Sequence, residues 1–193
     1  ALIGPDTHSA AEFQTTGVQW FGEFAAGVAE AADHLSFHMY ILGQGSKLPI
    51  HDLNSVFLNA SILDKGRKGV EALRTAVPAG HNATLWAGET SSANDGGLSG
   101  ATDTYINGFW YLDQLGLLAA ANVNVFVRQA LVAAGGYPLI EVSETSGTAP
   151  VLLPDFFVAL LCVVFFRSLP CVVFFFFLFG HRERLGAASR LSR

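Results

Sequence analysis

The sequence predicts an α/β fold with a parallel sheet, and specifically part of a (β/α)-barrel. Short runs of apolar, β-branched and aromatic residues alternate with segments of helical periodicity, an order that implies parallel strands joined by helices. Polar side chains follow the ends of several of these strands, where barrel enzymes carry their chemistry. No G-x-G-x-x-G opens a helix directly after a strand, which weakens a Rossmann interpretation, and the missing G-K-S/T excludes a P-loop.

Composition narrows the class of protein. With 193 residues, 51% of them hydrophobic and 14% charged, the chain is one domain or part of a larger one, and it can bury a sizeable core. A net charge of -5 gives no indication of nucleic-acid binding. Cys162 and Cys171 lie in an apolar run without metal-ligand spacing, so neither zinc nor redox chemistry is expected. The sequons at Asn59 and Asn82 lend weak support to a secretory route.

The first predicted elements are a short strand and a long helix. The chain starts at Ala1 without an initiator Met or a signal peptide, so we expect it to begin inside a fold. A strand at 2–3 is expected to break into a turn at 4–6. A helix follows from about residue 10 to 32, opened by a capping box at its start.

Residues 35–40 form the next predicted strand, and it carries the first candidate site residues. With a period of two, His38 and Tyr40 share one face, while Phe37 and Met39 share the other. A His and a Tyr near the end of a strand suit a polar site. The alternative is a hydrogen-bonded core His beside a half-buried Tyr.

The middle of the chain is predicted to be helical. A loop spans 43–49, residues 53–63 form a short helix or an irregular segment, and 69–77 form a helix. The basic cluster before the last of these favours a solvated surface over a site for an anionic ligand; it consists of Lys65, Arg67 and Lys68.

The apolar run 83–87 predicts a buried strand that ends at Gly88 and a carboxylate, Glu89, followed by a glycine-rich loop to Gly100. Glu89 is therefore a candidate reacting group, although a surface Glu at a strand end gives the same local pattern. Residues 103–121 form the clearest helix. The strand 123–129 ends in Arg128 and Gln129 and is followed by a glycine turn.

Several of these strings resemble heparanase and heparanase-like glycoside hydrolases. The match runs from about Ile3 to Leu161, in the order of the family, and it is most specific after Trp86. The strings are Gly4-Pro5-Asp6, Phe37-His38-Met39-Tyr40, Trp86-Ala87-Gly88-Glu89-Thr90-Ser91-Ser92-Ala93 with Gly96-Gly97, Gly108-Phe109-Trp110-Tyr111-Leu112-Asp113-Gln114-Leu115-Gly116, Val127-Arg128-Gln129 with Gly135-Gly136-Tyr137, and Leu153-Pro154-Asp155-Phe156-Phe157-Val158-Ala159-Leu160-Leu161.

The resemblance implies a retaining glycosidase that cuts β-linked glucuronic acid in polysaccharides of the glycosaminoglycan or proteoglycan type. Residues 1–161 would be the fifth to eighth strand–helix units of a (β/α)8 barrel, with Glu89 as the nucleophile on the seventh strand. The implied sugar contacts are His38, Tyr40, the backbone of Gly96, Gln129, and Gly135 with Tyr137 facing the uronate. No cofactor or metal is implied. Members of the family are secreted, lysosomal or membrane-associated.

The sequence departs from the family in its second carboxylate. The acid/base Glu of the family follows an Asn, and no Asn-Glu pair occurs in this chain. Asp6, Asp95 and Glu141 are acidic, but none occupies a matching position. Because general acid catalysis typically contributes about 10²–10⁴-fold, we expect this chain to be an inactive fragment. The alternatives are a barrel glycosidase of different sugar specificity and a non-catalytic, membrane-attached or carbohydrate-binding protein.

The tail, residues 162–193, is apolar and then basic. Arg167 and Pro170 split its apolar run, and the part after them is shorter than the ~20 residues that a membrane span requires, so membrane association is not favoured. A buried segment of an unusual domain is a second interpretation. The favoured hypothesis is a non-native tail, read from non-coding sequence and unrelated to the fold, because the resemblance stops at Leu161.

Overall fold

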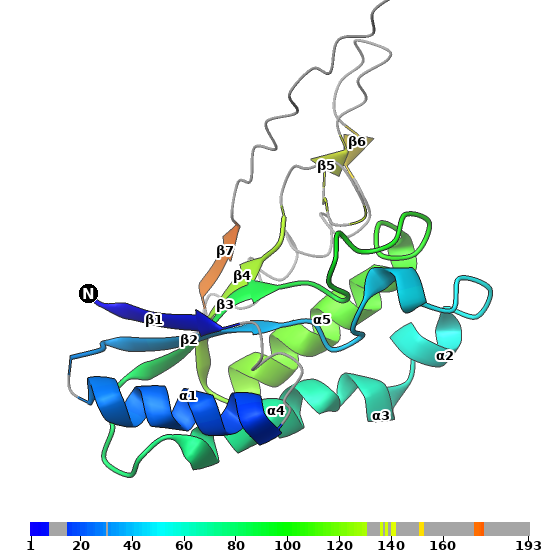
Figure 1. Cartoon of the computed structure of the whole chain (residues 1–193). Coiled ribbons are helices and arrows are strands. Elements are labelled where there is room, and N and C mark those ends of the chain that lie inside the picture. The colour runs from blue at the N-terminus through cyan, green and yellow to red at the C-terminus, as the bar shows by residue number, and fades with distance from the viewer. Residues whose placement is uncertain are drawn as a thin grey trace, which may run out of the picture.

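Five parallel strands form the central sheet (Figure 1). The computed structural model describes residues 1–7, 15–29 and 31–130, together with 136, 138, 140–141, 151–152 and 172–175. In sheet order the strands are β1 (Ile3–Thr7), β2 (His34–Met39), β3 (Thr84–Thr90), β4 (Val123–Arg128) and β7 (Val172–Phe175). Two short antiparallel strands, β5 (Ile140–Glu141) and β6 (Val151–Leu152), make a separate pair.

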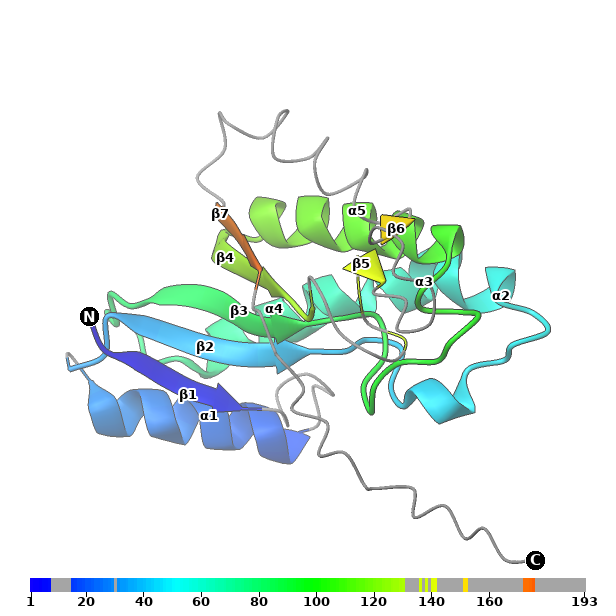
Figure 2. The same cartoon turned by 90° about the horizontal axis from the view of Figure 1, so that it is seen from above.

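The helices form one layer against the sheet. They are α1 (Thr15–Val28), α2 (Asn54–Phe57), α3 (Ala60–Leu63), α4 (Lys65–Ala76) and α5 (Tyr105–Ala120), with a 3-10 turn, η2 (Gly45–Lys47), after β2. Helix α1 packs on α4, and α4 packs on α5, on the same side of the strands (Figures 1 and 2). Strands β1 to β4 follow one another in sequence order, without the reversal of a doubly wound sheet. The predicted α/β fold with a parallel sheet is confirmed.

Alternation along the strands separates the core from the site. Leu35, Phe37 and Met39 are fully buried and belong to the core between the sheet and the helices. The intervening residues of β2 point to the opposite face, where His38 is only partly buried. This arrangement matches the predicted period of two and leaves the polar face of the sheet free for a site.

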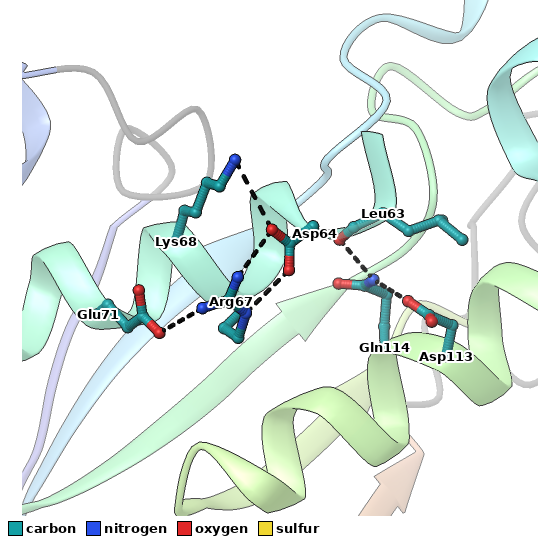
Figure 3. Close-up of polar contacts among 7 residues, drawn as sticks. All are labelled: Leu63, Asp64, Arg67, Lys68, Glu71, Asp113 and Gln114. Atoms are coloured by element: carbon teal, nitrogen blue, oxygen red, sulfur yellow. Dashed lines mark hydrogen bonds and ion pairs between the residues drawn. The ribbon is translucent and has the colours of Figure 1, made fainter. Parts of the chain in front are cut away.

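A surface ion-pair cluster begins α4 (Figure 3). Arg67 donates to Asp64 from Nε and from an amino group, each at 2.8 Å, and to Glu71 at 2.8 Å, while the Lys68 Nζ lies 3.7 Å from Asp64. Lys65, Arg67 and Lys68 are all exposed. This basic cluster is a solvated surface, as expected.

Gln114 links α5 to α3 by a hydrogen bond (Figure 3). Its Nε2 donates to the carbonyl of Leu63 at 3.0 Å and to Asp113 at 2.8 Å. A Cβ on Gly66 would lie 2.1 Å from the Oε1 of Gln114, so a side chain on Gly66 would collide with that amide.

The prediction of a turn at Gly4-Pro5-Asp6 is wrong, because these residues belong to β1. They pair with β2 in parallel, Gly4 opposite Leu35 and Pro5 opposite Ser36. Proline is tolerated here since β1 is an edge strand, where the missing N–H removes no bond from the interior of the sheet. Strand β3 likewise runs two residues beyond Gly88, so that Glu89 lies within it.

Part of the tail joins the sheet. The tail is expected to be unrelated to the fold, but β7 pairs with β4 from Val125 opposite Val172 to Arg128 opposite Phe175. An uncovered edge of β4 would expose unpaired N–H and C=O groups, and a β-branched and aromatic segment is well suited to pair with them. The other tail residues lie outside the described part of the chain. No helix among the described residues is long and apolar enough to cross a membrane.

Candidate active site

The candidate site lies where β1, β2, β3 and β4 end. Asp6, His38 and Glu89 are near the carboxyl ends of the first three of these strands, and Gln129 directly follows the fourth. Because the strands are parallel, their carboxyl ends lie together at one end of the sheet. These side chains therefore gather where α/β folds place their catalytic groups. A shift in the register of β2 and β3 brings His38 directly opposite Glu89.

Glu89 is held by a tyrosine. The hydroxyl of Tyr40 donates a hydrogen bond to Oε1 of Glu89. The Tyr40 side chain is almost completely buried, with 3% exposed, whereas the side chain of Glu89 is 33% exposed. A fixed donor therefore orients a carboxylate that solvent or a ligand can still reach. Hydrogen bonding of this kind stabilises negative charge on the acceptor oxygen.

The imidazole of His38 lies between two carboxylates. Its Nε2 is 3.2 Å from Oδ2 of Asp6, and its Nδ1 is 3.8 Å from Oε1 of Glu89. Burial lowers the pKa of His38, but the hydrogen bond to Asp6 and the charges of Glu89 and Asp6 together outweigh burial and raise that pKa above its ordinary value. The hydrogen bond from His38 is the main reason that the pKa of Asp6 is lowered. The site thus favours an imidazolium between two anions.

Backbone geometry makes room for Asp6. The register between β1 and β2 shifts between Pro5 and Thr7, and Asp6 adopts a positive φ of 57° at this irregularity. A Cβ on Gly88 would lie 2.1 Å from Oδ1 of Asp6, so a side chain there would occupy the place of the carboxylate. Bulges of this kind re-aim side chains beside active sites.

Two loops are joined beyond the strand ends. The amide of Asn94 donates to the carbonyl of Gly43 at 2.8 Å, and the amide of Gly45 donates to the carbonyl of Asn94 at 3.1 Å. Gly96 is exposed, has a φ of +83°, and accepts from the amide of Gly136 at 2.9 Å. The glycine-rich loop after β3 is therefore bonded both to the loop after β2 and to the segment after β4.

Arg128 links β3 to the segment after β4. Its side chain is fully buried, its Nη1 donates to the hydroxyl of Ser91 at 2.8 Å, and the same atom donates to the carbonyl of Gln129. The guanidinium lies 5.6 Å and 5.8 Å from the ring centroids of Trp110 and Tyr111, at a distance suited to cation–π attraction. The amide of Gln129 in turn donates to the carbonyl of Thr90 at 2.8 Å, which fixes Gln129 beside the end of β3.

The structure brings some of the sequence-predicted residues together. His38 and Tyr40 both meet Glu89, Gln129 lies one strand further along the edge, and Gly96 is joined to the same edge through Gly136. Gly135 and Tyr137 lie outside the described residues. Asp6, by contrast, was not expected at the site.

The contact of Asp6 with His38 was missed because Gly4-Pro5-Asp6 looks locally like a turn. Parallel pairing of β1 with β2 was the signal that could have found it, since that pairing sets the carboxyl end of β1 beside His38.

The arrangement suits nucleophilic chemistry by a carboxylate. Glu89 accepts from the hydroxyl of Tyr40 on one side and faces the imidazole of His38 on the other, so its carboxylate is oriented from two directions. Asp6 is ill-suited to general acid catalysis, which requires a carboxyl whose pKa is raised rather than lowered. No group of three or more His, Cys, Asp or Glu side chains that could hold a metal ion occurs in the described part of the chain.

Comparison with known proteins gives one family. Residues 7–116 match the model of the glycosyl hydrolase family 79 N-terminal domain. A baicalin-beta-D-glucuronidase from Scutellaria baicalensis is 37% identical over 148 residues, which cover 75% of this chain and 26% of that protein.

Two further relatives are named a heparanase-like protein and a heparanase. Heparanase-like protein 2 of Arabidopsis thaliana is 37% identical over 74% of this chain and 25% of its own length. The heparanase of Rattus norvegicus is 32% identical over 83% of this chain and 27% of its own length. The chain spans about a quarter of the length of these curated relatives.

Proposed function

Because this chain belongs to glycosyl hydrolase family 79, we propose that it carries the nucleophile of a retaining glycoside hydrolase that cleaves β-glucuronidic linkages in glycosaminoglycan- or proteoglycan-type polysaccharides. Glu89 is that nucleophile. The observation that carries the proposal is the position of Glu89 at the carboxyl end of a parallel strand, bonded to the hydroxyl of Tyr40 and facing the imidazole of His38. The names of the relatives, a β-D-glucuronidase and a heparanase, support the choice of linkage.

The proposed architecture is half of a (β/α)8 barrel. Strands β1 to β4 are its fifth to eighth strands, residues 1–161 belong to the barrel, and residues 162–193 are a tail, of which β7 pairs with β4. The sequential strand order and the single layer of helices support this assignment, because a barrel is wound in one direction with its helices outside.

The proposed reaction proceeds through a covalent intermediate. An ionised oxygen of Glu89 attacks the anomeric carbon, the bond from that carbon to the leaving oxygen breaks, and a glycosyl ester forms. A second carboxyl group, ionised after it has protonated the leaving oxygen, then takes a proton from water, whose oxygen attacks the same carbon from the other face and releases Glu89, so configuration is retained. Tyr40 and His38 hold the carboxylate of Glu89 in position before the first step.

The second carboxyl group is proposed to lie on a part of the barrel that this sequence does not contain. A retaining glycosidase needs an acid about 5–5.5 Å from the nucleophile to protonate the leaving oxygen. The chain has no Asn-Glu pair, and the carboxyl group of Asp6 is held in its ionised form. We therefore expect the chain alone to be inactive on ordinary glycosides, whose leaving groups require protonation.

The sugar contacts are proposed on the three segments that meet at the site. Gln129 and the backbone of Gly96 contact the sugar, and Gly135 with Tyr137 faces the uronate carboxylate. The hydrogen bond from the amide of Gly136 to the carbonyl of Gly96 supports this grouping, since it draws the two glycine loops together.

An activated substrate tests Glu89 without the missing acid. A dinitrophenyl β-glucuronide whose C2 hydroxyl is replaced by fluorine releases dinitrophenolate without protonation, and the fluorine slows hydrolysis of the ester. We expect the purified chain to gain one glucuronyl group, mapped to Glu89 by peptide mass spectrometry, and the Glu89→Gln variant to gain none. A folded chain that stays unlabelled, or that is labelled elsewhere, would disprove the role of Glu89.

The same assay separates the alternatives. Faster labelling by the matching fluoroglucoside than by the fluoroglucuronide would indicate a glycosidase of different sugar specificity. Binding of heparin-like chains without labelling would indicate a non-catalytic carbohydrate-binding protein, which the missing acid in the sequence would then explain.

A further inference from the structure

We propose that Asp6 is a positioning residue that keeps the imidazole of His38 doubly protonated and so fixes Glu89 for attack. This inference rests on the proposed function of Glu89 and adds a residue that acts through His38. The carboxylates of Asp6 and Glu89 lie on opposite nitrogens of the ring.

The two ion-pair contacts of the ring call for two protons. A carboxylate has no proton to share, so Nε2 of His38, which lies 3.2 Å from Oδ2 of Asp6, must carry a proton for the two groups to attract each other. The Nδ1 faces a second acceptor, Glu89, at 3.8 Å, which is an ion-pair distance rather than a hydrogen bond. A neutral ring would present a lone pair to one of these two anions, while an imidazolium attracts both.

The surroundings of His38 are consistent with a fixed charge. Asp6 from β1 and Glu89 from β3 lie against its two nitrogens, and Tyr40, two residues along its own strand, bonds Glu89. The side chain of His38 is 16% exposed, so its attraction to the two carboxylates is less screened than at the surface.

The backbone is built around the carboxylate of Asp6. Asp6 is the extra residue where the β1–β2 register shifts, and its positive φ turns it away from the regular pleat. Gly88, next to Glu89, leaves the space that Oδ1 occupies. Three separate features therefore place one carboxylate on Nε2, although the side chain of Asp6 itself is 54% exposed.

Asp6 also affects the intermediate. When Glu89 becomes an ester it loses its charge, and the attraction between Nδ1 and Glu89 disappears. With Asp6 still bonded to Nε2, the imidazolium keeps a counter-ion and its orientation. The ring is then ready to stabilise Glu89 again as the ester hydrolyses, with no proton exchanged with solvent between the two steps.

The test compares Asp6→Asn with a matched control, Asp33→Asn. Asp33 is exposed at the opposite end of the same pair of strands, where it accepts from the amide of Leu2. The titration of His38, followed by NMR and assigned with His38→Gln, should shift to lower pH in Asp6→Asn and stay unchanged in Asp33→Asn. Labelling of Glu89 by the fluoroglucuronide should slow about tenfold in Asp6→Asn, as for the loss of one charged hydrogen bond. In a plot of labelling rate against pH, the fall of the rate on the alkaline side should begin at a lower pH than in the parent chain.

A double variant distinguishes positioning from a general structural effect. If Asp6 acts through His38, adding Asp6→Asn to His38→Gln should slow labelling no further. An unmoved His38 titration, or additive effects in the double variant, would overturn the inference. A parent chain that is never labelled at Glu89, although its His38 titration depends on Asp6, would instead overturn the proposed function and with it the role of Asp6 in catalysis.

Discussion

Replacing Gly45 with Ala tests how the two loops above the site are held. Gly45 lies in η2 and does not have a positive φ, so alanine is compatible with its backbone conformation. The conflict is one of contact, because a Cβ on Gly45 would lie 2.1 Å from the carbonyl oxygen and 2.3 Å from the carbonyl carbon of Gly97. Both neighbouring atoms are backbone, so neither can move aside as a flexible side chain would.

The expected loss of stability follows from these distances. Real Cβ contacts are essentially never under 3.0 Å, so the two loops must separate by about 1 Å. That movement strains or breaks the bonds that Asn94 makes with Gly43 and Gly45, each worth about 1 kcal/mol. Overpacking of this kind typically costs about 1–3 kcal/mol. We therefore expect Gly45→Ala to lower the free energy of unfolding by about 2–3 kcal/mol.

Urea denaturation measures this loss, and Gly116→Ala is the matched control. Gly116 lies inside α5 with no atom within 4 Å of a Cβ, so alanine there should stabilise the chain by about 0.5–1 kcal/mol. Gly45→Ala should also slow labelling of Glu89, since the glycine-rich loop moves. A Gly45→Ala chain as stable as the parent would refute the argument that the contact between the loops requires glycine.

Three other outcomes follow from the same contacts. Tyr40→Phe should slow labelling of Glu89 about tenfold or more, because a bond to a charged oxygen is worth about 1.5–3 kcal/mol; an unchanged rate in the mass-spectrometric time course would contradict this. The pKa of Asp6 is lowered from 3.8 and the pKa of His38 is raised from 6.5. The stabilisation that the Asp6–His38 pair contributes is therefore lost as the pH falls through the pKa of Asp6 or rises through the pKa of His38. Urea titrations should therefore show the largest difference between parent and Asp6→Asn near pH 5–6, and a difference independent of pH would exclude the pair. Arg67→Ala should leave the urea midpoint unchanged, since its ion pairs are exposed; a clear drop would show that the cluster matters more than its exposure suggests.

Sequence periodicity predicted the elements with strong apolar patterns. Strands β2, β3 and β4 and helix α5 lie close to their expected ranges because their buried residues recur at the period of the element. Helix α4 begins four residues before its expected start at Gly69. Its first turn has no apolar pattern, and periodicity does not detect the exposed pairs that Arg67 makes there with Asp64 and Glu71.

The candidate site was predictable where one strand sets the geometry. His38 and Tyr40 were expected on one face of a strand, and both meet Glu89. Asp6 was not predictable from local pattern, because Gly4-Pro5-Asp6 favours a turn and only pairing with β2 extends it into a strand. The contact between Asp6 and Gly88 joins residues that are 82 positions apart, a relation that a single sequence does not contain.

Strand β7 bears on any attempt to rebuild an enzyme from parts. Strand β7 pairs along one side of β4. In the proposed barrel, the strand that closes the barrel would have to pair along that same side of β4. An added amino-terminal half of a relative would thus compete with the tail for the same four backbone positions, from Val125 to Arg128. Reassembly then becomes a strand-exchange reaction, in which the rate of β7 release limits recovery of activity and removing residues 162–193 accelerates it.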